Sequence, residues 1–372
     1  QLQDATIYRA AFSKRQLYQR MVEFWSDHFT IYYLKVGYLK TLDDREVIRR
    51  HALGKFPDLL KASAKSAAML AYLDQTVSRR GAPNQNYARE LMELHTLGVD
   101  GGYTQQDVAE LARILTGWTI RGRGEFFFNP ALHDFGQKTF LGRVFPAMDS
   151  MNNTNPAGIT EGEAVLDMLL AHPSTARFVA TKMLRFLLWY EPTREMVDRV
   201  AGVYTRTGGD IKEMVRASLS FEFLQQAPAK LKRPFHLVVS ALRGLNPTVG
   251  TGVQTARGVL NAMGQPLFNW LTPEGYPDTI EFWAGNLLPR WNGASQLASL
   301  AGTQMSVDVS RYMALGSADA VANEIGRQLF GGELQDRLRE QLVAYLRPAP
   351  RDQTRIREAL ALAVASAPFQ WY

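Results

Sequence analysis

Cysteine is absent from the 372 residues of this chain. Its absence excludes disulfide bonds, thiolate-bound zinc, iron–sulfur clusters and cysteine nucleophiles, because each of these needs a thiol. Long apolar runs are lacking too: the most apolar stretch, 178–190, is interrupted by Lys182 and Arg185, and a bilayer span needs about 20 apolar residues. We therefore expect no transmembrane segment, and any catalysis has to use carboxylates, hydroxyls, amines or imidazoles.

A strong excess of charge of one sign is also missing. The chain has 42 Lys+Arg against 36 Asp+Glu, a formal charge of +6. Nucleic-acid binding is typical of a basic stripe interleaved with stacking aromatics, whereas the basic residues here are interspersed with acidic ones. We do not expect nucleic acid as a partner. At 46% hydrophobic and 21% charged residues, the composition is that of an ordinary globular protein.

Strand-like alternation is rare, and apolar residues instead recur at helical spacing along most of the chain, as in 108–115. Helix start signals agree with this pattern, since Thr104 and Thr160 each precede an acidic residue by three positions and Ser174 and Asp210 suit N-caps. The sequence therefore predicts an all-α, multi-helix globular domain.

Residues 119–148 are the exception to the helical pattern. Glu125-Phe126-Phe127-Phe128 and Thr139-Phe140-Leu141 have strand-like content broken by Gly, Pro and Asn, which predicts a small irregular or β-hairpin insertion. A second irregular stretch covers 264–277, and long loops inside compact domains are often functional. We expect one helical domain over 1–372, with a soft boundary near 147–156.

The densest group of polar side chains lies within 84–98. On a helix, Asn86, Glu90 and Glu93 share a face, and neighbours three or four positions apart have Cβ atoms about 5–6 Å from each other. Glu90 and Glu93 are thus candidate catalytic carboxylates, and Asn86 and Arg89 are candidate substrate-binding residues. The alternative is a solvated helix face with an Arg89–Glu93 ion pair.

His133 and Asp134 lie in the irregular segment rather than on a helix, and functional side chains concentrate on loops. We expect His133 to join the catalytic group, with Asp134 holding its tautomer. An Asx-turn at Asp134, ahead of Gly136, is the alternative. Asp278 follows Tyr276-Pro277 and is a candidate substrate-binding residue, with an N-cap of the next helix as its alternative.

Metal-binding patterns are weak. His95 comes two positions after Glu93 and so faces another side of the helix, which leaves no Glu-x-x-His or His-Glu-x-x-His signature. A metal site built from Glu90, Glu93, His133 and Asp134 is an alternative that we do not favour. The cofactor is therefore left open.

Five stretches resemble a bacterial family known only as domain of unknown function 1800. They are the run 84–104, Leu115-Thr116-Gly117-Trp118, His133-Asp134, Lys138-Thr139-Phe140-Leu141-Gly142 and Tyr276-Pro277-Asp278-Thr279. His95, Lys138 and Tyr276 lie in these stretches and join the substrate-binding candidates. The family pattern has Glu where Gln85 stands, so this helix lacks a third carboxylate. The resemblance implies a periplasmic or secreted protein, often encoded beside a partner similar to alkaline-phosphatase-type hydrolases, and it implies no catalytic assignment.

These observations lead to two functional hypotheses. The first is an extracytoplasmic hydrolase of a carbohydrate-like or polyanionic polymer, in which the exposed parts of Trp118, Trp270, Trp283 and Trp291 stack on sugars. Glycoside hydrolysis needs two carboxyls about 5–5.5 Å or about 6.5–9.5 Å apart across an open cleft. The second is a non-catalytic binding or assembly protein whose polar helix belongs to a buried structural network. The first hypothesis presumes that the helix of Glu90 meets the loop of His133 in a wet cavity.

Overall fold

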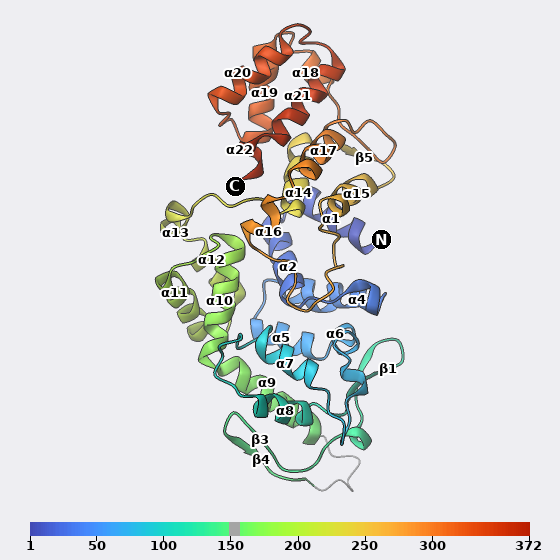
Figure 1. Ribbon diagram of the computed structural model, residues 1–372, viewed down its shortest axis with the longest axis vertical. Coiled ribbons are helices and arrows are strands. Elements are labelled where there is room, and N and C mark those ends of the chain that lie inside the picture. The colour runs from blue at the N-terminus through green and yellow to red at the C-terminus, as the bar shows by residue number, and fades with distance from the viewer. Residues whose placement is uncertain (149–156) are drawn as a thin grey trace. The chain divides into compact units, whose positions relative to one another are not determined.

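The computed structural model describes residues 1–148 and 157–372. Helices make up most of this part of the chain (Figure 1), with three two-stranded sheets between them. The α-helices are α1 (Leu2–Phe12), α2 (Gln16–His28), α3 (Tyr33–Val36), α4 (Leu39–Asp43), α5 (Phe56–Ala64), α6 (Ala67–Tyr72), α7 (Gln85–Glu93), α8 (Gln105–Ile114), α9 (Ala157–Ala171), α10 (Pro173–Leu187), α11 (Arg194–Thr207), α12 (Ile211–Ser218), α13 (Phe221–Gln226), α14 (Pro234–Leu245), α15 (Gln254–Ala262), α16 (Ile280–Ala284), α17 (Leu287–Ala298), α18 (Ser310–Met313), α19 (Ala318–Phe330), α20 (Asp336–Leu346), α21 (Gln353–Ala365) and α22 (Ala367–Gln370). The π-helix η1 (Asp44–Arg49) and the 3₁₀ turns η2 (Gln75–Val77) and η3 (Pro130–Leu132) complete the helical set.

The strands are short and pair only as antiparallel hairpins or a small bridge. They are β1 (Trp118–Arg121) with β2 (Glu125–Phe128), β3 (Lys138–Phe140) with β4 (Arg143–Phe145), and β5 (Thr248–Val249) with β6 (Met305–Ser306). The first two pairs fall in the predicted insertion, so the all-α architecture with a small β insertion is confirmed. Among the described helices, none combines the length and the apolarity that a bilayer crossing requires.

Contacts divide the described chain into two compact units. Unit 1 comprises residues 1–19, 228–267 and 277–372, and unit 2 comprises 20–227 and 268–276. Whether the units form a single domain over 1–372 stays a prediction. The soft boundary expected near 147–156 falls outside the described residues except for 147 and 148.

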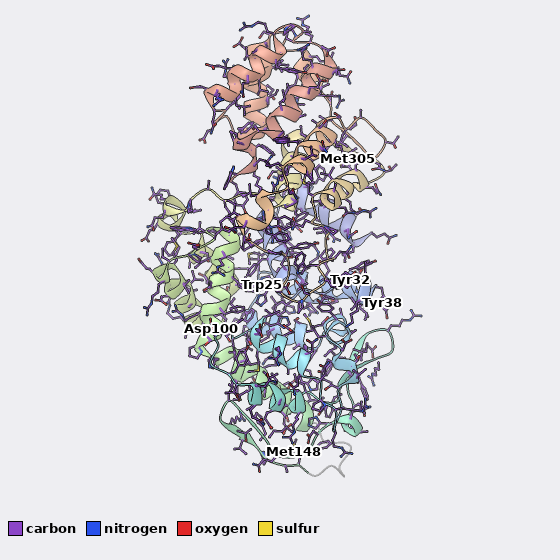
Figure 2. The ribbon with its side chains drawn as sticks, viewed as in Figure 1. Trp25, Tyr32, Tyr38, Asp100, Met148 and Met305 are labelled. Carbon is purple, nitrogen blue, oxygen red and sulfur yellow. The ribbon has the colours of Figure 1, made fainter. Side chains whose placement is uncertain are left out.

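The core of unit 2 gathers around Trp25 of α2 (Figure 2), which is fully buried. Its indole Nε1 donates to the carbonyl of Ala52 at 3.0 Å, and the rings of Phe29 and Phe56 lie 6.3 and 5.5 Å from its own. Tyr38 and Asp100, also labelled in Figure 2, are exposed. This aromatic core, in which the Trp25 indole has a hydrogen-bond partner, thus holds the helices that precede α7 in place.

Helix α9 packs against the insertion through two glycines one turn apart. A Cβ on Gly158 would stand 2.3 Å from Phe128 Cζ, and one on Gly162 would stand 2.3 Å from Trp118 Cζ2. Only glycine permits this approach of ring to helix. The first hairpin is therefore part of the unit 2 core.

Two of the four predicted helix starts are confirmed. Thr104 caps α8 in a capping box with Asp107, and the Asp210 side chain accepts from the amide of Lys212. Thr160 is wrong as a start, because α9 already begins at Ala157. Ser174 is wrong as well: His172 is the N-cap of α10 and its side chain accepts from the Ser174 amide, with Pro173 in the first turn, where its missing N–H costs nothing.

Replacement of Gly162 by Ala should destabilise unit 2. The new methyl would overlap the Trp118 indole, and overpacking of this kind typically costs about 1–3 kcal/mol. Chemical denaturation followed by circular dichroism measures the change. Gly202→Ala in α11 is the matched control, because its Cβ meets only the far end of Arg206, and it should be neutral or slightly stabilising. A Gly162→Ala protein as stable as the control would contradict this packing.

Candidate functional site

Helix α7 forms where the sequence predicts it and divides into a buried and an open face. The Asn84 side chain caps it by accepting from the Asn86 amide at 2.9 Å. Tyr87 on the inner face is buried and donates its hydroxyl to the carbonyl of Ala64 at 2.9 Å. The outer face carries Asn86, exposed, and Glu90, partly exposed. The polar residues of this helix therefore face outward from the core.

Glu90 and Glu93 stand one turn apart on that outer face, and both are partly exposed. Within the described part of the chain neither carboxylate forms an ion pair or accepts a side-chain hydrogen bond. The Arg89–Glu93 pair of the alternative interpretation is not formed, because the Arg89 guanidinium donates to Gln105 Oε1 at 2.8 Å. The carboxylates are thus free to meet a ligand.

Burial first, and then the negative charges of Glu93 and Glu274, raise the pKa of Glu90 to about 7 against the lowering effect of Arg89. The same surroundings raise the pKa of Tyr72, through burial first and then through Glu274 and Glu90. These couplings place Glu274 and the phenol of Tyr72 in the neighbourhood of Glu90. A half-protonated carboxylic acid at neutral pH is suited to proton transfer.

The segment 268–276 brings Glu274 to this neighbourhood. The Tyr72 hydroxyl donates to the carbonyl of Leu271 at 2.7 Å, which ties the segment to α6. The indole Nε1 of Trp270 donates to Glu274 Oε1 at 3.1 Å, and the rings of Trp270 and Tyr276 lie 5.0 Å apart. Two predicted aromatic residues therefore stand beside a carboxylate.

Gly275 is the residue that lets this segment approach α2. Its φ is +82°, and a Cβ there would come within 2.4 Å of the carbonyl oxygen of Asp27. Both the left-handed conformation and the close approach require glycine. The position of Glu274, the residue immediately before Gly275, depends on this turn.

His133 lies elsewhere in unit 2 and is fully buried. Its Nδ1 lies 2.7 Å from the carbonyl oxygen of Thr116, which assigns the proton to Nδ1, and its Nε2 lies 3.4 Å from Glu161 Oε2. The Lys138 ammonium donates to the same Glu161 oxygen at 2.6 Å, and it too is buried. The contacts of His133 involve the turn before β1 and helix α9, and none of those described reaches Glu90 or Glu93.

Asp134 does not hold the histidine tautomer as expected. Its Oδ2 accepts from Arg113 Nε at 2.8 Å, and its Oδ1 accepts from the Gly136 amide at 2.9 Å. The second bond is the Asx-turn that the sequence allowed. The guanidinium of Arg113 and these hydrogen bonds hold the pKa of Asp134 below its ordinary value, although burial opposes them.

His95 and Trp118 are both inside the core. The His95 ring is buried, and burial with the charge of Lys182 lowers its pKa to about 3, so the imidazole is neutral. Its carbonyl accepts from His28 Nε2 at 3.1 Å. Trp118 has no exposed surface, which removes the expectation that it stacks on a sugar.

The remaining candidates belong to unit 1. Asp278 pairs with the buried Lys230 at 2.7 Å, and the residue at the N-cap position of α16 is Thr279 rather than Asp278. Trp283 is buried and donates to the carbonyl of Pro277, whereas Trp291 is 52% exposed. Their described contacts therefore lie within unit 1.

A metal centre finds no support in the described residues, which contain no group of three or more His, Asp or Glu side chains able to hold a metal ion. The alternative built from Glu90, Glu93, His133 and Asp134 divides into two separate sets of contacts. The residues that sequence reasoning missed are Tyr72, Glu161 and Glu274. Only Glu274 had a signal, because it lies in the irregular stretch 264–277.

A family model described as a protein of unknown function (DUF1800) matches residues 1–371 of the chain. The chain belongs to this DUF1800 family. The resemblance of the five stretches is thereby confirmed over essentially the whole sequence. Comparison with curated proteins and with solved structures found no match.

Glu161→Gln should strongly destabilise this DUF1800 protein. The substitution leaves the buried Lys138 ammonium without its countercharge, and breaking a buried pair from one side costs about 3–5 kcal/mol. Denaturant unfolding measures the loss. Asp167→Asn on the same helix is the control, because the Lys61–Asp167 pair is exposed and worth at most about 1 kcal/mol. Equal stability of the two variants would rule out a structural role for the Lys138–Glu161 pair.

Glu90 should make the stability of the folded protein depend on pH. Its folded pKa of about 7 lies above the ordinary value of 4.5, so the folded state favours the protonated form and loses stability as pH rises from about 4.5 through about 7. Glu90→Gln removes this loss. We expect its melting temperature to exceed that of the wild type at pH 8 and to match it at pH 4. A difference independent of pH would contradict the raised pKa.

Proposed function

We propose that this protein is an extracytoplasmic hydrolase of a carbohydrate-like polymer and that Glu90 is its proton donor. The observation that carries the proposal is the unpaired, half-buried carboxylate of Glu90, with a pKa near 7, beside two further carboxylates that also lack a described cation. The buried carboxylate of Glu161, by contrast, is paired with Lys138. An acid left unpaired at a solvent-accessible position is a candidate for chemistry.

The chemistry follows from the arrangement on α7 and the segment 268–276. Glu90, protonated in part at neutral pH, donates its proton to the oxygen of the leaving sugar as the glycosidic bond breaks. Glu93 or Glu274 then serves as the second carboxylate, either attacking the anomeric carbon or removing a proton from the attacking water. Of the two, Glu274 is the more exposed.

The surroundings favour a neutral carbohydrate over a polyanion. The three carboxylates Glu90, Glu93 and Glu274 repel a negatively charged chain, and Arg89, whose charge lowers the pKa of Glu90, is engaged with Gln105. Trp270 is partly exposed and keeps its indole beside Glu274, where it can stack on the apolar face of a sugar. The periplasmic or secreted location and the alkaline-phosphatase-like partner rest on the family resemblance alone.

The second candidate is a non-catalytic binding or assembly protein. What favours it is the group around His133, in which Thr116, Glu161 and Lys138 form a buried set of contacts. Such networks fix one arrangement of a core and need no reaction to explain them. In this proposal His133, Asp134 and Lys138 are therefore structural, and catalysis depends on Glu90 and its neighbours.

The test is release of reducing sugars from a panel of neutral polysaccharides. Glu90→Gln should lower the rate by about 10²–10⁴-fold, the usual contribution of a general acid, while leaving the fold intact by circular dichroism. Wild-type activity should fall as pH rises above 7, because Glu90 loses its proton. Glu213→Gln, on the exposed face of α12, is the control and should keep full activity.

Three results would overturn the proposal. Activity of Glu90→Gln equal to that of the wild type would remove Glu90 from the reaction. Binding of the wild type to insoluble polysaccharide without release of sugar, lost in Trp270→Ala, would instead support the binding protein. Failure of the wild type both to bind and to cleave any member of the panel would count against a carbohydrate substrate.

A further inference from the structure

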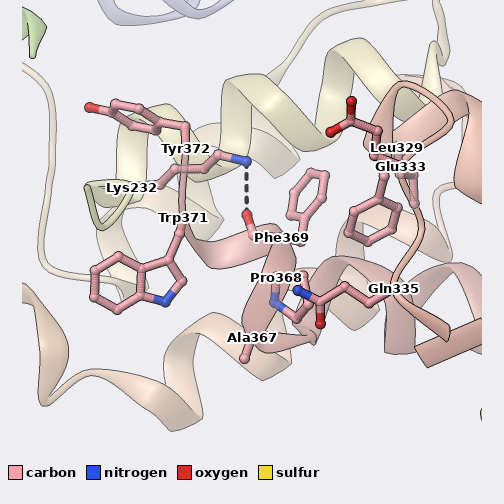
Figure 3. A pocket seen from close by; sticks show the side chains of 10 residues that line it. Lys232, Leu329, Glu333, Gln335, Ala367, Pro368, Phe369, Trp371 and Tyr372 are labelled. Carbon is pink, nitrogen blue, oxygen red and sulfur yellow. Dashed lines mark hydrogen bonds between the residues drawn. The ribbon is translucent and has the colours of Figure 1, made fainter. Parts of the chain in front are cut away.

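Unit 1 contains a pocket of about 700 Å³ that has no part in the chemistry around Glu90 (Figure 3). This volume lies within the usual range of small-molecule sites, about 300–1,000 Å³. Its walls are mainly apolar and aromatic, and one side chain with a positive charge, Lys232, contributes to them. A pocket of this kind has the composition of a ligand site.

The chain builds this pocket from segments far apart in sequence. Phe330 stands at the end of α19, and Phe369 belongs to α22. The two rings meet edge to face at 5.8 Å. The backbone amide of Lys232 donates to the carbonyl of Gln370 at 2.8 Å, which fixes Lys232 against α22. The lining is therefore held in place by backbone pairing before any ligand arrives.

Lys232 is 9% exposed and lies against the aromatic wall. Its Nζ donates to the carbonyl of Phe369 at 2.8 Å and stands 4.1 Å from the centre of the Phe369 ring (Figure 3). An ammonium has three donors, so two remain beyond this hydrogen bond. Within the described part of the chain no carboxylate pairs with Lys232. The cation is thus partly satisfied and lacks a countercharge.

Burial lowers the pKa of Lys232 to about 8, so the amine is still mostly protonated at neutral pH. A buried charge without a partner is costly unless an opposite charge joins it. The acidic residue that lines the pocket, Glu333, is exposed and lies toward the side of Leu329 in Figure 3. The side chains that line the pocket therefore leave Lys232 without a countercharge.

The residues that line the pocket indicate the chemistry of the uncharged part of the ligand. Phe330 and the 36%-exposed Trp371 offer flat apolar surfaces, and aromatic rings pack well against such surfaces. We propose that this pocket binds a small aromatic carboxylate, with its carboxylate on the Lys232 ammonium and its ring against Phe330 and Trp371. The inference concerns unit 1 and does not depend on the hydrolase proposal.

The probe is 2-naphthoate, compared with 2-naphthalenemethanol, which has the same ring and no charge. Binding to the whole protein is measured by isothermal titration calorimetry and by saturation-transfer NMR at pH 7. We expect naphthoate to bind at least tenfold more tightly than the alcohol, because a charge-assisted hydrogen bond is added. Its affinity should decline above pH 8, as Lys232 loses its proton.

Variants distinguish the contribution of the Lys232 charge to binding from that of the aromatic walls. Lys232→Met should weaken naphthoate at least tenfold and leave the alcohol unchanged, Lys232→Arg should retain naphthoate binding, and Phe330→Ala should weaken both probes. Lys14→Met, at an exposed lysine of unit 1, is the control and should change neither affinity. Circular dichroism of each variant checks that unit 1 is folded.

Several outcomes overturn the inference. They are equal affinity of wild type for naphthoate and the alcohol, unchanged naphthoate binding in Lys232→Met, and no detectable naphthoate binding at all. If Lys232→Met fails to fold, the other two variants still test the inference. Loss of naphthoate binding in Lys232→Arg contradicts the proposed pose, and so does unchanged naphthoate binding in Phe330→Ala.

Discussion

The buried contact between Lys138 and Glu161 is the interaction on which the insertion of unit 2 depends. It joins β3 to α9 across charges that are almost completely removed from water, and such a pair is stable only where geometry and further hydrogen bonds offset desolvation. Glu161 also faces His133 Nε2 at 3.4 Å, while the glycines of α9 admit Phe128 and Trp118. The hairpins are consequently core structure, and His133 is held as part of that core.

The carboxylate of Glu90 lies in an environment opposite to that of Glu161. Glu161 is buried with a cation, whereas Glu90 is partly buried beside other acids, so its environment raises the pKa rather than cancelling the charge. The difference lies in what each helix faces. Helix α9 contacts a lysine from β3, whereas the negative charge of Glu274, from the segment 268–276, acts on Glu90 of α7. Pairing, more than burial alone, therefore distinguishes structural from candidate functional acids in unit 2.

The sequence predicted the features that depend on local signals. Helical spacing, the Thr104–Asp107 capping box and the strand-like content of 119–148 were sufficient for the architecture. Thr160 carried the same local pattern and was wrong, because α9 continues ahead of it. The partners of His133 could not be inferred, since Glu161 lies on a separate helix and no spacing rule connects the two. Glu274 was not predicted as a site residue for the same reason. Its approach to Glu90 depends on the tertiary position of its segment, which the Gly275 turn makes possible.

Both candidate sites were inferred from the same observation, a buried or half-buried ionisable group that forms no described ion pair. The group is an acid in one site and a lysine in the other. Around Glu90, burial and the like charges of Glu93 and Glu274 outweigh the opposing charge of Arg89, which keeps the acid partly protonated and disfavours anionic ligands. In the pocket of unit 1, Lys232 is buried without a described anion among aromatic walls, which favours an anionic ligand. Because the two environments select opposite charges, a single ligand would not satisfy both. The two proposals, one for the residues of α7 and one for Lys232, therefore call for different ligands.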